Sequence, residues 1–356
     1  MNPTHSRPRR SRLGLAVFLV VTTLIAWEAV NALVPAKPPR MTGLRFLRAA
    51  WAVAHGETGE LDVIDVDAAR FAFRPLPYVN YGYKPSFPRE VGEGGAVRTS
   101  NSLGFRGPEV ESPKPEGRYR IVCLGGSTTY SYFVSDDETY PVHLQRELRE
   151  RRPDLDVEVV NAGVESYTTA ESLANLAFRV LDLQPDAIVI YHACNDVRPR
   201  KYRNFDPAYF HYRKVWDGDV SGFREVGGER NGINFFIQHA PPQPPGREAE
   251  NIHNAGTWAY RRNLTSLVGI AKAHGVLPIL VTFAATEGPD PSMSEAILEE
   301  NVVLSEVARA QGVPCIDFAP KMPLDAQYFA DQVHVTVEGA RLKARLIAEE
   351  LVGLLP

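Results

Sequence analysis

Strand-like and helix-like segments alternate regularly from about residue 117 to the end of the chain. Short, almost wholly apolar segments, such as residues 119–125 and 186–196, are typical of strands buried on both faces of a sheet. Helical periodicity follows at residues 140–152, with Pro141 in the first turn. Alternation at this spacing predicts a parallel sheet covered by helices on both faces. Ligands should then gather at the carboxyl ends of the strands.

The remaining elements follow the same pattern. A capping box formed by Thr168 and Glu171 marks the start of one predicted helix. Further strands are predicted at residues 157–163, 276–283 and 313–318, and further helices at residues 170–183, 258–275, 295–312 and 337–354.

The first 36 residues are predicted to form a cytoplasmic tail and a transmembrane signal anchor. Four arginines between residues 7 and 12 precede an apolar stretch from Leu13 to Val34 that only Glu28 interrupts. As a helix, this stretch would rise about 33 Å, enough for a bilayer core of about 30 Å. The remainder of the chain would then be exported, periplasmic or extracellular, with the membrane as a partner. The alternative is secretion after signal cleavage, because small residues lie at 34–36.

Two further segments interrupt or precede the regular pattern. Residues 37–116 are predicted to be an N-terminal extension without a core of its own, ending in a linker rich in Pro, Gly and charge. A lid-like insertion is predicted at residues 197–257, since so long a loop in a compact domain is usually functional. Its aromatic residues form either the core of the lid or stacking surfaces for sugar rings. They are Tyr202, Phe205, Tyr209, Phe210, Tyr212 and Trp216.

Composition excludes several classes of function. A net charge of −4 argues against nucleic acid as a partner, because phosphate binding requires a basic surplus. Three cysteines, at positions 123, 194 and 315, do not make a disulfide framework and are predicted to be buried thiols. No H-E-x-x-H sequence or close Cys/His cluster is present, so no metal is expected. No dinucleotide-binding pattern is complete, so no cofactor is expected either.

Four polar stretches lie at the ends of predicted elements. Ser127, Asn161–Gly163 and Asn195–Asp196 follow the first three strands, and Asp331–His334 precedes the last helix. Each stretch alone is common in turns and on surfaces. Their order, at one side of a single domain, supplies the parts for acyl transfer by a serine.

The predicted catalytic group is a triad. Ser127 is the predicted nucleophile, and its hydroxyl needs a base because serine is a weak nucleophile at neutral pH. His334 is the predicted base, and Asp331 is close enough in sequence to hold its imidazole in the required tautomer.

An oxyanion hole is predicted beside the triad. Gly163 would offer a backbone N–H, Asn195 a side-chain amide, and Ser127 its own N–H at the start of a helix. Gly125 and Gly126 are predicted to let the chain turn sharply and approach the substrate.

These four stretches resemble the blocks of the SGNH hydrolase superfamily, the GDSL-type esterases and lipases. The blocks are "GGSTT" with Ser127, "NAG" with Gly163, "ACND" with Asn195, and "DQVH" with Asp331 and His334. The "NSLGFRG" segment before the linker resembles that of membrane-anchored bacterial members and is predicted to pack beside the cleft.

The resemblance covers residues 117–356 and implies a flavodoxin-like three-layer α/β/α sandwich with a parallel sheet. Two positions depart from the family pattern. Gly126 replaces the usual Asp, and Ala193 replaces a glycine, so that its methyl group is predicted to narrow the oxyanion side of the pocket. His192, beside the site, is predicted to be a hydrogen-bonded core residue rather than a catalytic one.

The sequence therefore predicts an exported serine esterase that forms an acyl-Ser127 intermediate. Its expected substrate is a small acyl ester, such as acetyl, on a cell-envelope or extracellular glycan, or a lipid ester. An O-acetyltransferase with the same triad is the first alternative, and a lipase or thioesterase is another. A non-catalytic glycan-binding envelope protein is disfavoured by the intact set of triad residues.

Overall fold

The computed structural model describes residues 72–87, 90–91, 95–213 and 246–356. The predicted tail and signal anchor, residues 1–36, lie outside the described residues. Among the residues that are described, no helix is both long and apolar enough to cross a membrane.

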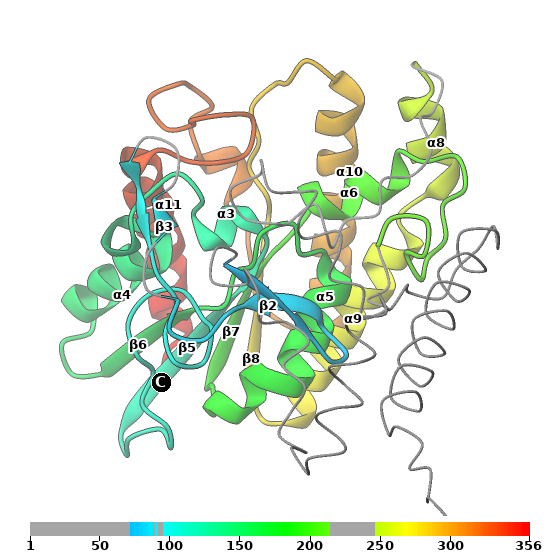
Figure 1. The fold of residues 1–356 in the computed structure, drawn as a ribbon. Coiled ribbons are helices and arrows are strands. Elements are labelled where there is room, and N and C mark those ends of the chain that lie inside the picture. The colour runs from blue at the N-terminus through cyan, green and yellow to red at the C-terminus, as the bar shows by residue number, and fades with distance from the viewer. Residues whose placement is uncertain (1–71, 88–89, 92–94, 214–245) are drawn as a thin grey trace, which may run out of the picture. The chain divides into compact units, whose positions relative to one another are not determined.

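A parallel sheet forms the centre of the described structure, as predicted (Figure 1). Its strand order is β6-β5-β7-β8-β9, so the chain starts in the middle, steps to one edge and then crosses to the other side. The order in which strands are added to the sheet therefore changes direction between β5 and β7. Ligands of such sheets bind at this point, beyond the carboxyl ends of the strands. The strands are β5 (Arg118–Gly125), β6 (Asp156–Asn161), β7 (Ala187–Tyr191), β8 (Leu277–Val281) and β9 (Cys315–Ile316).

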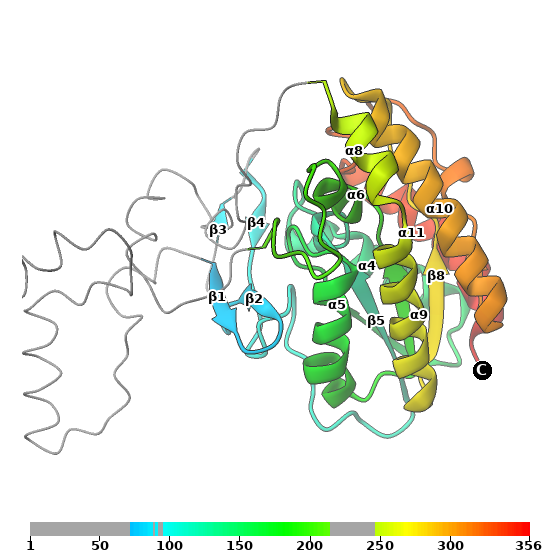
Figure 2. The ribbon, with the colours of Figure 1, turned by 90° about the vertical axis from the view of Figure 1, so that its right-hand side faces the viewer.

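Helices cover both faces of this sheet, which gives the predicted three-layer α/β/α arrangement (Figures 1 and 2). On one face α4 (Tyr140–Arg151) packs against α11 (Val337–Leu351). On the other face α5 (Thr169–Asn175) packs against α9 (Trp258–Ala273), which also contacts α10 (Pro291–Gln311). Two buried apolar clusters pack the helices against the sheet. Because the central strands contribute side chains to both clusters, these strands are almost fully apolar.

Some predicted boundaries were wrong. The strand predicted at 186–196 ends at Tyr191, because its neighbour β5 ends at Gly125, directly opposite. The helix α6 (Cys194–Arg200) follows instead. The helix predicted at 170–183 begins with the expected capping box, but it continues beyond α5 as a π-helical turn and a 3₁₀ turn.

The described part of the N-terminal extension packs onto this domain. Two short antiparallel pairs form there, and hydroxyl groups from one of them reach the domain: Tyr81 donates to the carbonyl of Glu165 at 2.7 Å, and Tyr83 to its carboxylate at 3.0 Å. These hydroxyl groups thus fasten the described part of the extension to the surface of the domain. Its strands are β1 (Phe73–Leu76), β2 (Asn80–Tyr83), β3 (Glu90–Val91) and β4 (Val97–Arg98).

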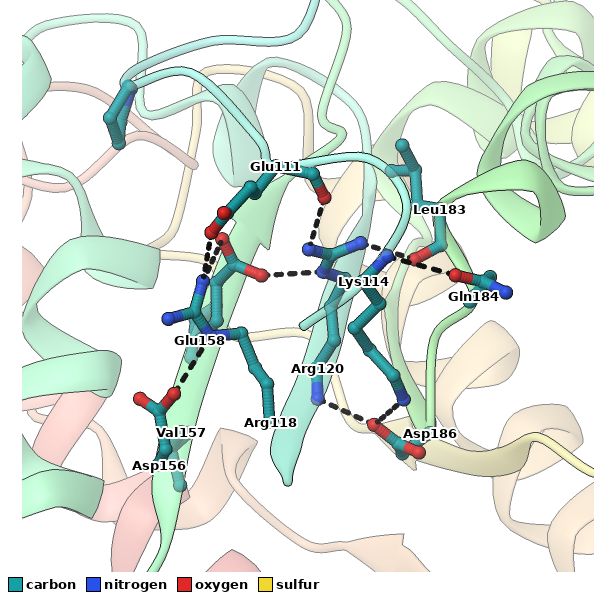
Figure 3. A network of polar contacts seen from close by, with 12 residues as sticks. Glu111, Lys114, Arg118, Arg120, Asp156, Val157, Glu158, Leu183, Gln184 and Asp186 are labelled. Carbon is teal, nitrogen blue, oxygen red and sulfur yellow. Dashed lines mark hydrogen bonds and ion pairs between the residues drawn. The ribbon is translucent and has the colours of Figure 1, made fainter. Parts of the chain in front are cut away.

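Ion pairs fasten the predicted linker to the amino ends of the strands (Figure 3). Arg120 is fully buried, lies 2.5 Å from Glu158 and donates to the carbonyl of Glu111 at 2.8 Å. Asp186 accepts from the Arg120 backbone N–H at 2.7 Å and from Lys114 at 2.6 Å. Removing one partner of such a buried pair typically costs ~3–5 kcal/mol. This network therefore supports the fold at the amino ends of the strands, whereas Ser127 lies at their carboxyl ends.

The described ends of the insertion, residues 197–213 and 246–257, contain α6 and α8 (Glu248–Ala255). Here the ring of Phe205 lies 5.4 Å from that of His211, and Tyr202 lies 6.1 Å from Tyr212. This packing agrees with the interpretation of these aromatic residues as a core of the insertion. Trp216, which was grouped with them, lies outside the described residues.

Candidate active site

Ser127, His334 and Asp331 form one hydrogen-bonded chain at the carboxyl edge of the sheet. The hydroxyl oxygen of Ser127 lies 2.7 Å from Nε2 of His334, and Nδ1 of the same ring lies 2.7 Å from Oδ2 of Asp331. The serine and the histidine are 207 positions apart in the sequence. The fold therefore brings together the three residues that the sequence predicted as a triad, in the geometry of a nucleophile, a base and an orienting carboxylate.

Backbone hydrogen bonds hold Asp331 in place. Its Oδ1 accepts from the N–H groups of Val333 at 2.8 Å and of His334 at 2.7 Å. Partial burial acts to raise the pKa of Asp331, but the bonds from His334 and the backbone outweigh it and lower the pKa to about 2. The carboxylate is therefore ionised at all physiological pH values and can stabilise an imidazolium that forms on His334.

Ser127 begins the short helix α3 (Ser127–Tyr130), which starts directly after β5. First-turn N–H groups lack partners within a helix, so the N–H of Ser127 lies where an oxyanion can be bound. Neither Gly125 nor Gly126 adopts a positive φ, so the sharp turn from β5 into α3 does not depend on the left-handed conformation that favours glycine.

These two glycines are instead required by close packing. A Cβ on Gly125 would lie 2.1 Å from Oγ1 of Thr129, and one on Gly126 would lie 2.4 Å from Nδ2 of Asn195. In this packing a Cβ at position 126, where the family pattern has Asp, would require the Asn195 amide to shift.

Asn195 lies in the first turn of α6, and its amide reaches towards the nucleophile. Nδ2 donates to the carbonyl of Tyr167 at 3.0 Å. A carboxamide nitrogen has two donors, so one hydrogen remains for an oxyanion. Ala193, whose methyl group was predicted to narrow the oxyanion side of the pocket, is 1% exposed and packs in the buried core.

Gly163 has a different environment from the one predicted. Its N–H donates to Oδ1 of Asn161 at 3.0 Å, so this donor is already occupied. A Cβ at Gly163 would lie 2.3 Å from the backbone nitrogen of Tyr130. Gly163 therefore lets the segment that follows β6 approach the backbone of α3, and its predicted role as an oxyanion donor does not fit this geometry.

Several residues beside the triad were not predicted. The rings of Tyr132 and Phe133 lie 5.9 and 5.4 Å from the ring of His334. The turn at Ser166 and Tyr167, whose carbonyl binds Asn195, has Ser166 in the left-handed region with φ 60°. The aromatic run after Ser127 could have indicated the first pair, whereas nothing in the sequence marks Ser166.

The "NSLGFRG" segment packs beside the site, as predicted, and does so through Arg106. This guanidinium is buried and donates to the carbonyls of Tyr130, of Ser131 at 2.7 Å and of Val134 at 2.5 Å. It also pairs with Asp136 at 2.8 Å. The extension therefore holds the backbone that directly follows the nucleophile.

Two buried residues near the site are structural, as expected. His192 is 2% exposed, bonds to the Ser172 hydroxyl at 2.7 Å, and burial lowers its pKa to about 4. Asp196 accepts from the Thr169 N–H at 3.0 Å and from its hydroxyl at 2.6 Å, which braces the start of α5.

The cysteines are free, with Cys123 and Cys194 buried and Cys315 partly buried. Burial raises the pKa of Cys123 to about 12, so this thiol is unreactive. Within the described ranges no group of His, Cys, Asp and Glu is arranged to hold a metal ion.

Residues 123–342, more than half of the chain, match the profile of the GDSL-like lipase/acylhydrolase family. The chain belongs to this family. It is therefore an ester-hydrolysing serine hydrolase of the SGNH superfamily, as the sequence blocks indicated. None of the curated proteins compared with it matches significantly.

Solved structures similar to this GDSL-family chain include three bacterial hydrolases. The acetylxylan esterase of Geobacillus stearothermophilus is 21% identical, with a TM-score of 0.45, over 66% of this chain and 94% of that one. The lipase/acylhydrolase of Enterococcus faecalis is 24% identical, with a TM-score of 0.44, over 67% and 97%. A GDSL-like lipase of Bacteroides thetaiotaomicron is 18% identical, with a TM-score of 0.41, over 66% and 89%.

The contact between Gly126 and the Asn195 amide yields a test. In Gly126→Ala the new methyl group should push the amide away from the nucleophile, and we expect kcat for ester hydrolysis to fall by ~100-fold, as when an oxyanion donor is lost. Steady-state kinetics with p-nitrophenyl acetate measures this. The matched control is Gly269→Ala, on the exposed face of α9 with open space around it, which should keep full activity and gain ~0.5–1 kcal/mol of stability. Wild-type kcat in Gly126→Ala would contradict the steric argument.

Proposed function

We propose that this hydrolase cleaves carboxylic esters through an acyl-Ser127 intermediate. The observation that carries the proposal is the continuous hydrogen-bonded chain from Ser127 through His334 to Asp331. His334 Nε2 removes the hydroxyl proton as Oγ of Ser127 attacks the acyl carbon. Asp331 keeps the other ring nitrogen protonated and stabilises the imidazolium.

The tetrahedral intermediate then collapses. Its oxyanion is stabilised by the N–H of Ser127 and the free amide hydrogen of Asn195. His334 passes its proton to the leaving alkoxide, which departs as an alcohol and leaves the acyl group on Ser127. In the second half His334 removes a proton from water, the hydroxide attacks the acyl carbon, and the released Ser127 oxygen takes the proton back.

The nucleophile assignment is tested with detergent-solubilised full-length protein. Ser127→Ala should reduce hydrolysis of p-nitrophenyl acetate to the background rate and abolish labelling by a fluorophosphonate probe. Ser305→Ala is the control, because its hydroxyl bonds to the Asn301 carbonyl at 2.9 Å within α10 and lies 3.9 Å from the sulfur of Cys315, away from the triad. The assignment is refuted if Ser127→Ala and Ser305→Ala hydrolyse the ester at equal rates.

We further propose that the substrate is a small acyl group, such as acetyl, on an envelope or extracellular glycan. Support comes from Phe210 of the insertion, whose side chain is 65% exposed, since an exposed aromatic ring suits the face of a sugar. A lipid ester is the other candidate substrate, and an O-acetyltransferase would pass the same acyl group to a sugar hydroxyl instead of to water.

Product analysis separates these candidates. We expect an acetylated oligosaccharide to release free acetate, with p-nitrophenyl acetate cleaved at least ~10-fold faster than p-nitrophenyl octanoate. Mass spectrometry after incubation with an acetyl donor and unmodified oligosaccharides should show no acetylated sugar above background. Acetylated sugar in excess of free acetate would identify a transferase, and preference for the octanoate would favour a lipase.

The proposed location is a membrane anchor with the catalytic domain exported. Its support is the arginine-rich start and the apolar stretch from Leu13 to Val34. In an expressing bacterium, protease added to spheroplasts should degrade the catalytic domain while the enzyme remains with the membrane after carbonate extraction. A variant that lacks residues 1–36 should stay inside the spheroplasts and be protected. Release of an active product shortened at its N-terminus into the periplasm would indicate signal cleavage instead.

A further inference from the structure

One buried arginine at the described end of the insertion reaches the turn that holds Asn195. Nη2 of Arg213 donates to the carbonyl of Ser166 at 2.5 Å, and Nε lies 2.5 Å from Oε1 of Glu171. Arg213 is 8% exposed and Glu171 is 6% exposed. The pair is thus a charge-assisted contact in a site of low dielectric, where such bonds are strong and directional.

Glu171 continues this contact on the other side of the turn. Its second carboxylate oxygen accepts from the N–H of Thr168 at 2.7 Å and from its hydroxyl at 2.6 Å. Arg213 and Glu171 together therefore hold the two residues that flank Tyr167, Ser166 by its carbonyl and Thr168 by its N–H. The backbone carbonyl of Tyr167 has little freedom between these fixed points.

The Tyr167 carbonyl is the acceptor for the Asn195 amide, at 3.0 Å. A Cβ on Gly126, the residue before the nucleophile, would lie 3.2 Å from the same carbonyl. The direction of the Asn195 amide thus depends on where this carbonyl lies. Ser166 holds a left-handed φ of 60°, which is unfavourable for a residue with a Cβ and persists only when surrounding contacts impose it.

We propose that Arg213 is a positioning residue of the hydrolase. It belongs to the insertion rather than to the sheet, and with Glu171 it fixes the Ser166–Thr168 turn so that Asn195 presents its amide to the oxyanion. The inference rests on the proposed acyl-Ser127 mechanism. Arg213 touches neither substrate nor Ser127, and its effect is exerted through the turn. Formation of the acyl-enzyme should therefore slow when Arg213 is removed, while substrate binding changes little.

The experiment compares Arg213→Ala with Arg120→Ala in the full-length protein. Arg120 is the matched control, because it too is buried, lies 2.5 Å from a carboxylate and donates to backbone carbonyls, but at the opposite edge of the sheet. We expect Arg213→Ala to lower kcat and the rate of the acylation burst with p-nitrophenyl acetate by ~10- to 100-fold, with KM changed less than ~3-fold. Arg120→Ala should lose thermal stability and keep wild-type kcat while folded.

Two additional measurements separate positioning from general destabilisation. Added guanidinium should restore part of the kcat that Arg213→Ala loses. If Arg120→Ala also loses kcat, guanidinium should restore none of that loss. The double variant Arg213→Met/Glu171→Gln leaves no unpaired buried charge and retains the capping box, since Gln serves there as well as Glu. It should be folded, and its kcat should be as low as that of Arg213→Ala.

Different failures have different meanings. A wild-type kcat in the folded double variant would overturn the positioning role of Arg213 and leave the proposed function standing, provided that wild-type activity depends on Ser127. Equal losses of kcat in Arg213→Ala and Arg120→Ala, without rescue by guanidinium, would also overturn it. Absence of Ser127-dependent hydrolysis in the wild type would refute the proposed function and this inference with it.

Discussion

Close approach of backbone segments around the start of α3 is the constraint on which the rest of the site depends. The segment that follows β6 approaches the helix at Gly163, where a Cβ would lie 2.3 Å from the Tyr130 nitrogen. The Asn195 amide approaches the backbone at Gly126. Because the interior is this tightly packed, a single methyl group at either place would have to move a functional group or the nucleophile helix itself. The orientation of Ser127 towards His334 therefore follows from packing as much as from its own hydrogen bond.

Buried arginines keep this packed region in place from outside the sheet. Arg106, from the N-terminal extension, donates to three carbonyls after the nucleophile. Arg213, from the insertion, donates to the turn that holds Asn195. A guanidinium has five donors in a rigid fork, which suits it to hold several carbonyls at fixed positions. Segments that surround the α/β architecture thus contribute directly to the geometry of the site.

The parallel sheet could be predicted because its evidence is local. Apolar runs of five to eight residues, helical periodicity and the Thr168 capping box are all contained in short windows. Strand ends were less predictable, since β7 stops at Tyr191 only because its neighbour β5 stops opposite to it. The same applies to the linker, which composition alone indicated, whereas the ion pair of its Lys114 with Asp186 involves a partner distant in the sequence.

The sequence by itself determined the fold class, the family and four residues of the candidate site: Ser127, Asn195, Asp331 and His334. Each of them follows a strand or precedes a helix in a short block, and strand ends of a parallel sheet meet at one edge. Only the tertiary structure decided that the Gly163 N–H is occupied by Asn161, and that the glycines serve close packing. It alone brought Arg213 to Ser166, 47 positions away. Such contacts depend on how whole elements pack, and no local pattern of residues encodes them.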